Sequence, residues 1–502
     1  MHADAIKKLY RFAEAKDRKG ESLYKDIKMA HDETQLEHIS KIEKKIPAGK
    51  GGDDVCGSSA WKAARGNSSS KKNIDITGLE MMSCTHGTVV YSANLFKGET
   101  YKHTHLQHLK SYEKGTKFFC NDVICKYWPF AIKVGQLFAD SNPEYQKLTE
   151  DMVPFLSRFH GLGHSWACRV LYNGHWEKDG ADMLGEEQEQ VFSYMARLGS
   201  TTKHQSRASR RDDISSAILY FNVDKEKRMI PSLCLWLNRA RCRTLLYEKK
   251  LQNLLDRRGL KKEDLPEVLQ RLKKQAKLVN SKRLTVEWEV GLLQKELEGE
   301  CHMIKVLHTR NATFFDTCKA RTANRKIMSK KKKKVDAIVD LLSGKGIKVS
   351  KENLDTGFFP WHNTKEFSVG DDYELVDTWM LSLRYEEAIV QAKKEMGEFI
   401  RSLTSLCFDL QSDIKNYEKI RPVTLLNYSR SILANTEIVR IREILRKALN
   451  QFTDALNLNI SEDSEIDPQD FLEMVEKEEE LLEALQEETD EESDNDEEGE
   501  KF

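Results

Sequence analysis

The stretch GLEMMSCTHGTVVYSANLFKGETY, residues 78–101, decides the class of fold. It contains two apolar, β-branched runs, at 79–83 and 88–96, which the short segment CTHGT separates. Two such runs joined by a tight turn predict a pair of strands. A third strand is predicted over 117–124, KFFCNDVI, and the aromatic run KYWPF follows it. We therefore expect a sheet within the first 225 residues.

Beyond about residue 226 the sequence changes to long helical periodicity with few prolines. Between residues 385 and 417, apolar side chains recur every three or four positions and describe one face of a helix. They are Tyr385, Ile389, Ala392, Met396, Phe399, Leu403, Leu406, Leu410, Ile414 and Tyr417. This face predicts either a coiled coil or the inner face of a helical bundle, and packing within the chain is the favoured alternative.

These patterns predict an α/β plus all-α protein, in which a mixed sheet is followed by a long helical or coiled-coil region and a disordered acidic tail. The expected segments are a core at 1–225 with a loop insertion at about 44–72, a helical domain at 226–342, a linker at 343–372, a helical or coiled-coil segment at 373–460, and the tail at 461–502.

The formal net charge of −1 hides an uneven distribution of charge. Residues 461–502 hold 21 acidic side chains and two lysines, so the other 460 residues carry 78 basic and 60 acidic side chains, a net of +18. A basic body attracts polyanions, and an acidic tail either competes for that surface or is only a solvated appendage.

Other features of the composition exclude several classes of protein. No stretch approaches the ~18 apolar residues of a membrane span, and the charged amino terminus does not resemble a signal peptide. The ten cysteines are irregularly spaced in a long chain. They therefore indicate thiols or metal ligands in an intracellular protein, and not a disulfide framework.

Two acidic side chains are candidates for a metal-dependent site that acts on a nucleic-acid backbone. Such chemistry needs oxygen ligands that hold two divalent ions roughly 4 Å apart, and Mg²⁺ prefers carboxylates. Asp122 falls in a predicted apolar strand, where an unpaired charge is costly; alternatively, it ends the strand and caps the next helix. Glu189 opens a helix, with Glu186 one turn before it, although an acidic first turn also simply favours a helix start.

Histidine, cysteine and basic side chains lie near these acids in the sequence. His160, His164 and Cys168 recur every four residues, so a helix would align them either for a structural Zn²⁺ or for packing around the site. A basic cluster follows Glu189 and predicts contacts with DNA phosphates or a solvated face. Its members are Lys203, His204, Arg207, Arg210 and Arg211. The five lysines at 330–334 indicate a nuclear-localisation or nucleic-acid patch.

Four ordered motifs between residues 73 and 225 closely resemble those of the Kyakuja-Dileera-Zisupton (KDZ) transposases. They are DITGLEMMSCTHGTVVYSANLFKGETY, FFCNDVICKYWPF, FHGLGHSWACRVLYNGHW and LGEEQEQVFSYMARLGSTTKH. The resemblance implies an RNase H-like sheet with a metal-binding acid triad, and a DDE-type enzyme that cuts and joins DNA strands with Mg²⁺ or Mn²⁺. It also implies a nuclear protein whose partners are transposon ends and target DNA, and which can pair DNA ends as a homo-oligomer.

By this resemblance, Asp122 takes the place of the family's second acid, and Glu189 or Glu186 that of the third. Glu189 is favoured because the run Glu-Gln-Val-Phe-Ser resembles the Glu-Arg-Val-Phe-Ser run of hAT transposases. Asp4, in HADAIKKLYRF, takes the place of the first acid.

The setting of Asp4 departs from the family pattern. Ala5 and Ile6 follow it where the family has Gly and Asn, and only three residues precede it, which we expect to be too few for a central strand. Two further functions therefore remain open. One is an inactive, transposon-derived DNA-binding protein, and the other is a helical scaffold whose 385–417 face recruits a partner.

Overall fold

A computed structural model describes most of the chain. The described residues are 1–15, 20–25, 27–47, 55–56, 59–60, 73–96, 98–157, 160–183, 185, 187–282, 290–313, 318–362, 368–420 and 424–458. The predicted acidic tail and most of the predicted loop at 44–72 lie outside them. Two compact units divide the chain, Met1–Glu226 with Leu260–Asp377 and Lys227–Gly259 with Thr378–Phe502. Among the helices in these described ranges, none is apolar over a length that would cross a bilayer.

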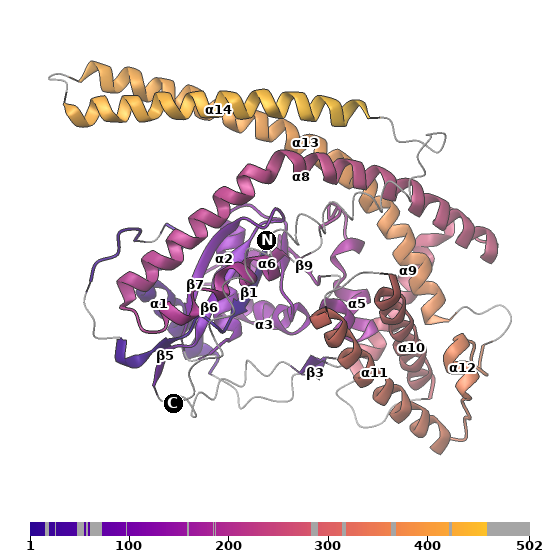
Figure 1. Ribbon diagram of the computed structural model, residues 1–502. Coiled ribbons are helices and arrows are strands. Elements are labelled where there is room, and N and C mark those ends of the chain that lie inside the picture. Colours follow the sequence, from indigo (N-terminus) through magenta and orange to yellow (C-terminus); the bar gives the residue numbers. More distant parts are fainter. Residues whose placement is uncertain are drawn as a thin grey trace. The chain divides into compact units, whose positions relative to one another are not determined.

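The first unit is built on a five-stranded mixed sheet in the order β7-β6-β1-β8-β9 (Figure 1). The strands are β1 (His2–Ile6), β6 (Gly78–Ser83), β7 (Val89–Leu95), β8 (Phe118–Cys120) and β9 (Val153–Phe155). β6 is antiparallel to β1 and β7, whereas β8 is parallel to β1 and β9. The strands predicted over 79–83 and 88–96 are therefore confirmed.

The third predicted strand, 117–124, is only partly correct. β8 ends at Cys120, and helix α3 (Ile124–Leu137) begins four residues later. The apolar residues that suggested a longer strand, Val123 and Ile124, instead lead into this helix. Ile124 is fully buried in its first turn.

Helices cover both faces of the sheet, as the alternation of side chains along β6 requires. Leu79 and Met81 pack on one face with residues of α6 (Glu187–Ala196) and α8 (Arg207–Arg258). Met82 packs on the other face with α3, and α2 (Tyr101–Glu113) contributes partly buried tyrosines there. All six residues of β6 are consequently buried.

β1 is the middle strand of the sheet, with β6 on one side and β8 on the other. Its five residues pair with β6 along their whole length, from His2 opposite Ser83 to Ile6 opposite Leu79. The expectation that Asp4 has too few preceding residues to lie in a central strand is therefore wrong. Asp4 stands in the centre of β1, and the missing Gly and Asn do not prevent strand formation.

Glu80 is a buried carboxyl group of β6, 1% exposed, and burial raises its pKa from 4.5 to about 8. Because the pKa is higher in the folded than in the unfolded state, the folded protein binds more protons, and its stability falls as pH rises between these values. Relative to the native chain, Glu80→Gln should therefore be nearly neutral at pH ~5 and stabilising by about 3 kcal/mol at pH ~8. Urea unfolding of both proteins at the two pH values measures this, and a pH-independent difference would contradict it.

The rest of the first unit is helical. Its helices are α1 (Asp32–Lys45), α4 (Glu144–Glu150), α5 (Trp166–Tyr172), α7 (Gly199–Thr202), α9 (Leu265–Lys282), α10 (Val290–Thr313), α11 (Cys318–Gly344) and α12 (Lys351–Thr356). Two short strand pairs lie outside the main sheet. They are β2 (Arg11–Phe12) with β5 (Ile74–Ile76), and β3 (Val55–Cys56) with β4 (Ser59–Ala60). α10 and α11 share an apolar core with Phe359 and Trp361 from the predicted linker.

The lysine run at 330–334 lies on α11 and is not a single exposed patch. Lys331 is 1% exposed and forms an ion pair with Glu300 at 2.9 Å, and Lys334 pairs with Glu300 and Glu296. Lys332 and Lys333 are exposed. The run therefore combines buried structural lysines with a solvated face.

The second unit contains the later part of α8, most of α13 (Val369–Lys419) and α14 (Leu425–Asn457). Ala392 and Met396 pack against both Leu233 of α8 and Phe452 of α14. Further along, Ile414 packs with α14 alone, so α13 and α14 run side by side as a helical hairpin (Figure 1). Most of the 385–417 face thus packs within the chain, as in the bundle alternative. Leu406 does not, since it is 41% exposed and the neighbouring Cys407 is buried against α14.

Candidate active site

Asp4 and Asp122 lie side by side at the middle of the sheet. β1 and β8 pair in parallel with His2 opposite Cys120. Two residues further along each segment are Asp4, still in β1, and Asp122, in the turn between β8 and α3. The strand pairing ends at Cys120 and brings the two segments together, and the Asp122 carboxylate lies near enough to raise the pKa of Asp4. This register explains why residues 118 positions apart in sequence meet.

The third acid approaches from the helix that covers the sheet. Asp4 and Ile6 share one face of β1 because side chains alternate along a strand. Ile6 packs with Val191 of α6, and Glu189 lies in the first turn of the same helix. Asp4 therefore faces the side of the sheet that carries Glu189.

A histidine connects the second and third acids. His160 Nδ1 lies 3.0 Å from Asp122 Oδ2, and His160 Nε2 lies 3.4 Å from Glu189 Oε1. A single imidazole ring therefore separates the two carboxylates. His2 Nε2 lies 3.6 Å from the other oxygen of Asp122, Oδ1. Side-chain exposure rises from 4% at His2 to 23% at Asp122 and 58% at Glu189, so the cluster opens to solvent at Glu189.

The charges of the cluster shift the pKa values of two acids in opposite directions. Burial and the Asp122 carboxylate raise the pKa of Asp4 well above its usual value, and Glu189 adds to this. Burial also acts to raise the pKa of Asp122, but His160 and His2 outweigh it and bring that pKa below its usual value. Carboxylates this close repel one another, which is the arrangement that a bound cation would relieve.

Two buried amides position the acids, and sequence reasoning did not single them out. Asn121 donates to the carbonyl oxygen of Ala3 at 2.9 Å and accepts from the Val123 amide, which fixes the turn around Asp122. Gln188 donates to the carbonyl oxygens of His2 and Met81 at 2.8 and 2.9 Å. Each amide directly precedes an acid in sequence, and this adjacency is the signal that could have identified them.

Other predictions for the site need correction or lie outside the described residues. Asp122 does not cap α3, since Val123 occupies the N-cap position and no side chain caps it. The alternative third acid, Glu186, lies outside the described residues. His160, His164 and Cys168 do not share a helix, because His160 begins a short 3₁₀ turn (His160–Gly163) and α5 starts only at Trp166.

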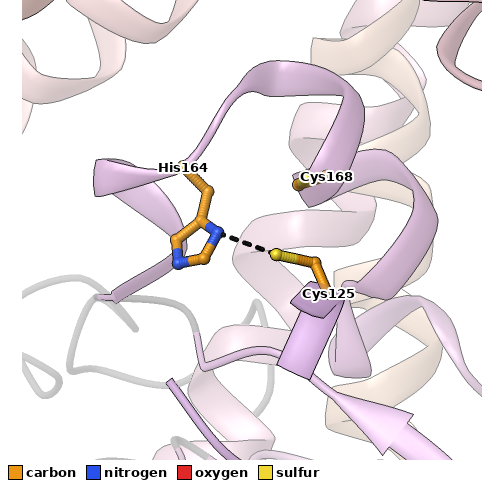
Figure 2. A group of neighbouring side chains, drawn as sticks. All are labelled: Cys125, His164 and Cys168. Carbon is orange, nitrogen blue, oxygen red and sulfur yellow. Dashed lines mark hydrogen bonds between the residues drawn. The ribbon is translucent and has the colours of Figure 1, made fainter. Parts of the chain in front are cut away.

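His164 and Cys168 instead meet Cys125, at the start of α3 (Figure 2). The ligand atoms of these three buried side chains all lie within 4.8 Å of one another. In the described part of the chain this is the one group of three or more such side chains so close together. His160 instead contacts Asp122 and Glu189, so the predicted set His160, His164 and Cys168 divides between two clusters.

The predicted DNA-binding cluster also divides. Arg210 is 1% exposed and donates to Asn94 Oδ1 and the Leu9 carbonyl oxygen. Arg211 donates to carbonyl oxygens of the 25–30 segment and lies 3.5 Å from Asp32. Both arginines are held by contacts within the protein, which favours a structural role for them over phosphate binding.

The remaining members of the basic cluster lie at the surface. His204 and Arg207 are exposed, and Lys203 is partly exposed. His204 stacks against Phe12 with ring centroids 5.1 Å apart, while the Arg207 guanidinium lies 3.8 Å from Asp32 Oδ2 and remains 43% exposed.

Comparison with known protein families identifies the first part of the chain. Residues 1–222 match the family model described as Kyakuja-Dileera-Zisupton transposase. No curated protein and no solved structure matches the chain. Residues 1–222 of the chain therefore belong to the KDZ transposase family, and the assignment from the four sequence motifs is confirmed.

Proposed function

We propose that residues 1–222 form the catalytic core of a DDE-type transposase, which cuts DNA strands at transposon ends and joins the freed 3′ hydroxyl to target DNA. The observation that carries this proposal is the convergence of Asp4, Asp122 and Glu189, from three separate elements, in a member of a transposase family. An RNase H-like fold is part of the proposal. The strand order β7-β6-β1-β8-β9 supports this fold. In it, β6 is antiparallel to both of its neighbours, whereas β1, β8 and β9 run parallel to one another.

The same three acids would hold Mg²⁺ or Mn²⁺. Their oxygens are the hard donors that these ions prefer, and the raised pKa of Asp4 marks a site with an excess of buried negative charge. Bound ions would activate the attacking hydroxyl and stabilise the leaving oxygen. The His160 ring lies between Asp122 and Glu189 and contacts both carboxylates. Glu189 is exposed to solvent, so the DNA backbone would approach the acids from its side.

DNA binding, a nuclear location and pairing of two DNA ends by a homo-oligomer complete the proposal. Lys203, His204 and Arg207 follow the Glu189 helix directly and present basic or imidazole groups to solvent. Such groups gain affinity for a phosphate backbone by releasing condensed counterions.

The test is nicking of DNA that carries the genomic sequences flanking the gene. The full chain should nick it with Mg²⁺ or Mn²⁺ and not with EDTA. Absence of metal-dependent nicking by a folded protein that binds this DNA would refute catalysis and favour an inactive DNA-binding protein. If the protein neither binds nor nicks the DNA, the whole proposal fails.

Charge removal in the basic segment gives a separate prediction. If Lys203 and Arg207 contact phosphates, Lys203→Ala and Arg207→Ala should each flatten the slope of log affinity against log salt by about 0.9. Lys147→Ala, at an exposed position on α4, is the matched control and should leave the slope unchanged. Fluorescence anisotropy across a salt series measures the slopes, and equal slopes for all variants would place the DNA elsewhere.

A further inference from the structure

A second cluster of metal-ligating side chains lies beside the acids. Cys125 is in the first turn of α3, His164 precedes α5, and Cys168 is in α5 (Figure 2). They are 8%, 3% and 2% exposed, respectively. The cluster shares no residue with the acid site, and its donors are two thiols and an imidazole.

We propose that Cys125 Sγ, His164 Nδ1 and Cys168 Sγ bind a zinc ion as three of its four ligands. Zinc lies roughly 2.3 Å from thiolate sulfur and 2.0–2.1 Å from imidazole nitrogen, so a tetrahedral site places the two donor atoms roughly 3.5 Å apart. Cys125 Sγ and His164 Nδ1 are 3.5 Å apart. A cysteine–histidine hydrogen bond alone accounts for that distance, but it does not require the third donor, Cys168, within the same 4.8 Å.

The donor set selects zinc over the ions proposed for the acids. Thiolate and imidazole are ligands of zinc and other borderline or soft ions, whereas Mg²⁺ prefers oxygen. Neither Cys125 nor Cys168 forms a disulfide, so their sulfurs are not joined to each other. No fourth histidine, cysteine or acid joins the group among the described residues. The described residues therefore supply three of the four ligands.

Hydrogen bonds to the backbone of His164 and Cys168 hold these two ligands in place. Lys331 donates to the carbonyl oxygen of His164 at 2.8 Å and is itself fixed by its buried ion pair with Glu300. The Ser165 side chain accepts from the Cys168 amide at 3.3 Å and caps α5. Such outer contacts orient metal ligands and raise affinity.

Zinc at this position would act as a positioning device for the acid site. Cys125 follows Asp122 by three residues, and His164 follows His160 by four. One ion that joins Cys125 to His164 therefore ties together the two segments whose side chains meet at 3.0 Å, His160 and Asp122. This role rests on the proposed function, whereas zinc binding itself does not.

Zinc content of the full chain tests the binding. The protein expressed with zinc in the medium should contain about one zinc per chain by elemental analysis, with X-ray absorption showing two sulfur ligands and at least one imidazole. Cys125→Ser and Cys168→Ser should each lower the occupancy at least about tenfold, because each removes a thiolate ligand. Cys234→Ser, at a half-buried cysteine in the second unit, is the control and should retain zinc.

Several outcomes would overturn the proposal. They are a zinc-free chain that also takes up none from added Zn²⁺, zinc with only oxygen and nitrogen ligands, or full occupancy in Cys125→Ser. X-ray absorption uses the native chain, so it decides the matter even if the variants do not fold. Failure of the proposed function is distinguishable, since a zinc-loaded chain that never nicks DNA refutes the enzyme and leaves the zinc site intact.

The positioning role has its own readout. Removal of zinc by a chelator, followed by addition of excess Mg²⁺, should lower nicking and also lower the melting temperature, and zinc should restore both. Nicking that is unchanged in zinc-depleted protein would remove the link to the acid site. The zinc ion would then have a structural role that does not affect the acid site.

Discussion

Asp122→Asn is expected to lower metal-dependent DNA nicking by about 10³-fold or more, the largest effect of any single substitution on activity. Asp122 raises the pKa of Asp4 and contacts His160, which in turn contacts Glu189, so Asp122 is the central member of the cluster. The amide keeps the shape of the side chain but removes the negative charge that a divalent ion requires. Nicking under single-turnover conditions in Mg²⁺ measures the loss.

The control for this substitution is Asp140→Asn, which makes the same change at an exposed position beyond α3. It should leave nicking unchanged. Asp122→Asn should also remove the like charge that raises the pKa of Asp4, and with it part of the repulsion in the metal-free protein. The substitution also loses the interactions with His160 and His2 that hold the pKa of Asp122 below its usual value. These two effects oppose each other, so the variant should remain folded, with a circular dichroism spectrum like that of the native chain. Nicking within a few-fold of the native rate would contradict the assignment of Asp122.

Gly299→Ala is expected to destabilise the protein strongly. A methyl group at Gly299 of α10 would lie 2.3 Å from ring atoms of Trp166, which is fully buried. The indole cannot easily move, because its Nε1 donates to Glu296 Oε2 at 2.9 Å on the same helix. Overpacking of this kind costs typically about 1–3 kcal/mol, and here it outweighs the gain in helix propensity from alanine.

Gly291→Ala offers a matched comparison on the same helix. A methyl group there meets nothing within 4 Å, and the position is exposed. It should stabilise α10 by up to ~1 kcal/mol, since alanine is the better helix former. Urea unfolding of the native chain and both variants gives the three stabilities. Equal effects of the two substitutions would show that Trp166 does not pack against Gly299 in solution.

The sheet strands were predictable where the pattern was local. The runs at 79–83 and 88–96 lie within one or two residues of β6 and β7, because their apolar and β-branched residues favour a strand directly. β1 could not be recognised as a central strand in this way. Its residues, HADAI, show little hydrophobic pattern, and its place depends on pairing with β6 and β8 from distant parts of the chain.

The basic side chains show a different limit of sequence reasoning. Composition places Arg210 in a predicted DNA-binding or solvated cluster and Lys331 in a predicted nuclear-localisation or nucleic-acid patch, yet both side chains are buried. Helical spacing contained the signal, because Arg210 shares a face with Ile214 and Ile218, four and eight residues on. The charge of a side chain predicts exposure, but the helix face on which the side chain lies determines whether it is buried.

The cysteine–histidine cluster depended on tertiary structure. Cys125 and His164 are 39 residues apart, and no close pair of cysteines marks the site in the sequence. The regular spacing of His160, His164 and Cys168 suggested one helix and one site. The break at Ser165 separates the 3₁₀ turn from α5 and lets His160 serve the acids while His164 joins the cysteines.

The most direct measurement is X-ray diffraction from crystals soaked in Mn²⁺, recorded near the manganese absorption edge. Three carboxylates that converge on one side of a sheet to bind divalent ions should give an anomalous peak within about 2.0–2.6 Å of oxygens from Asp4 and Asp122, with Glu189 beside it. Full Mn²⁺ occupancy elsewhere in the molecule, with no peak between these acids, would contradict the account.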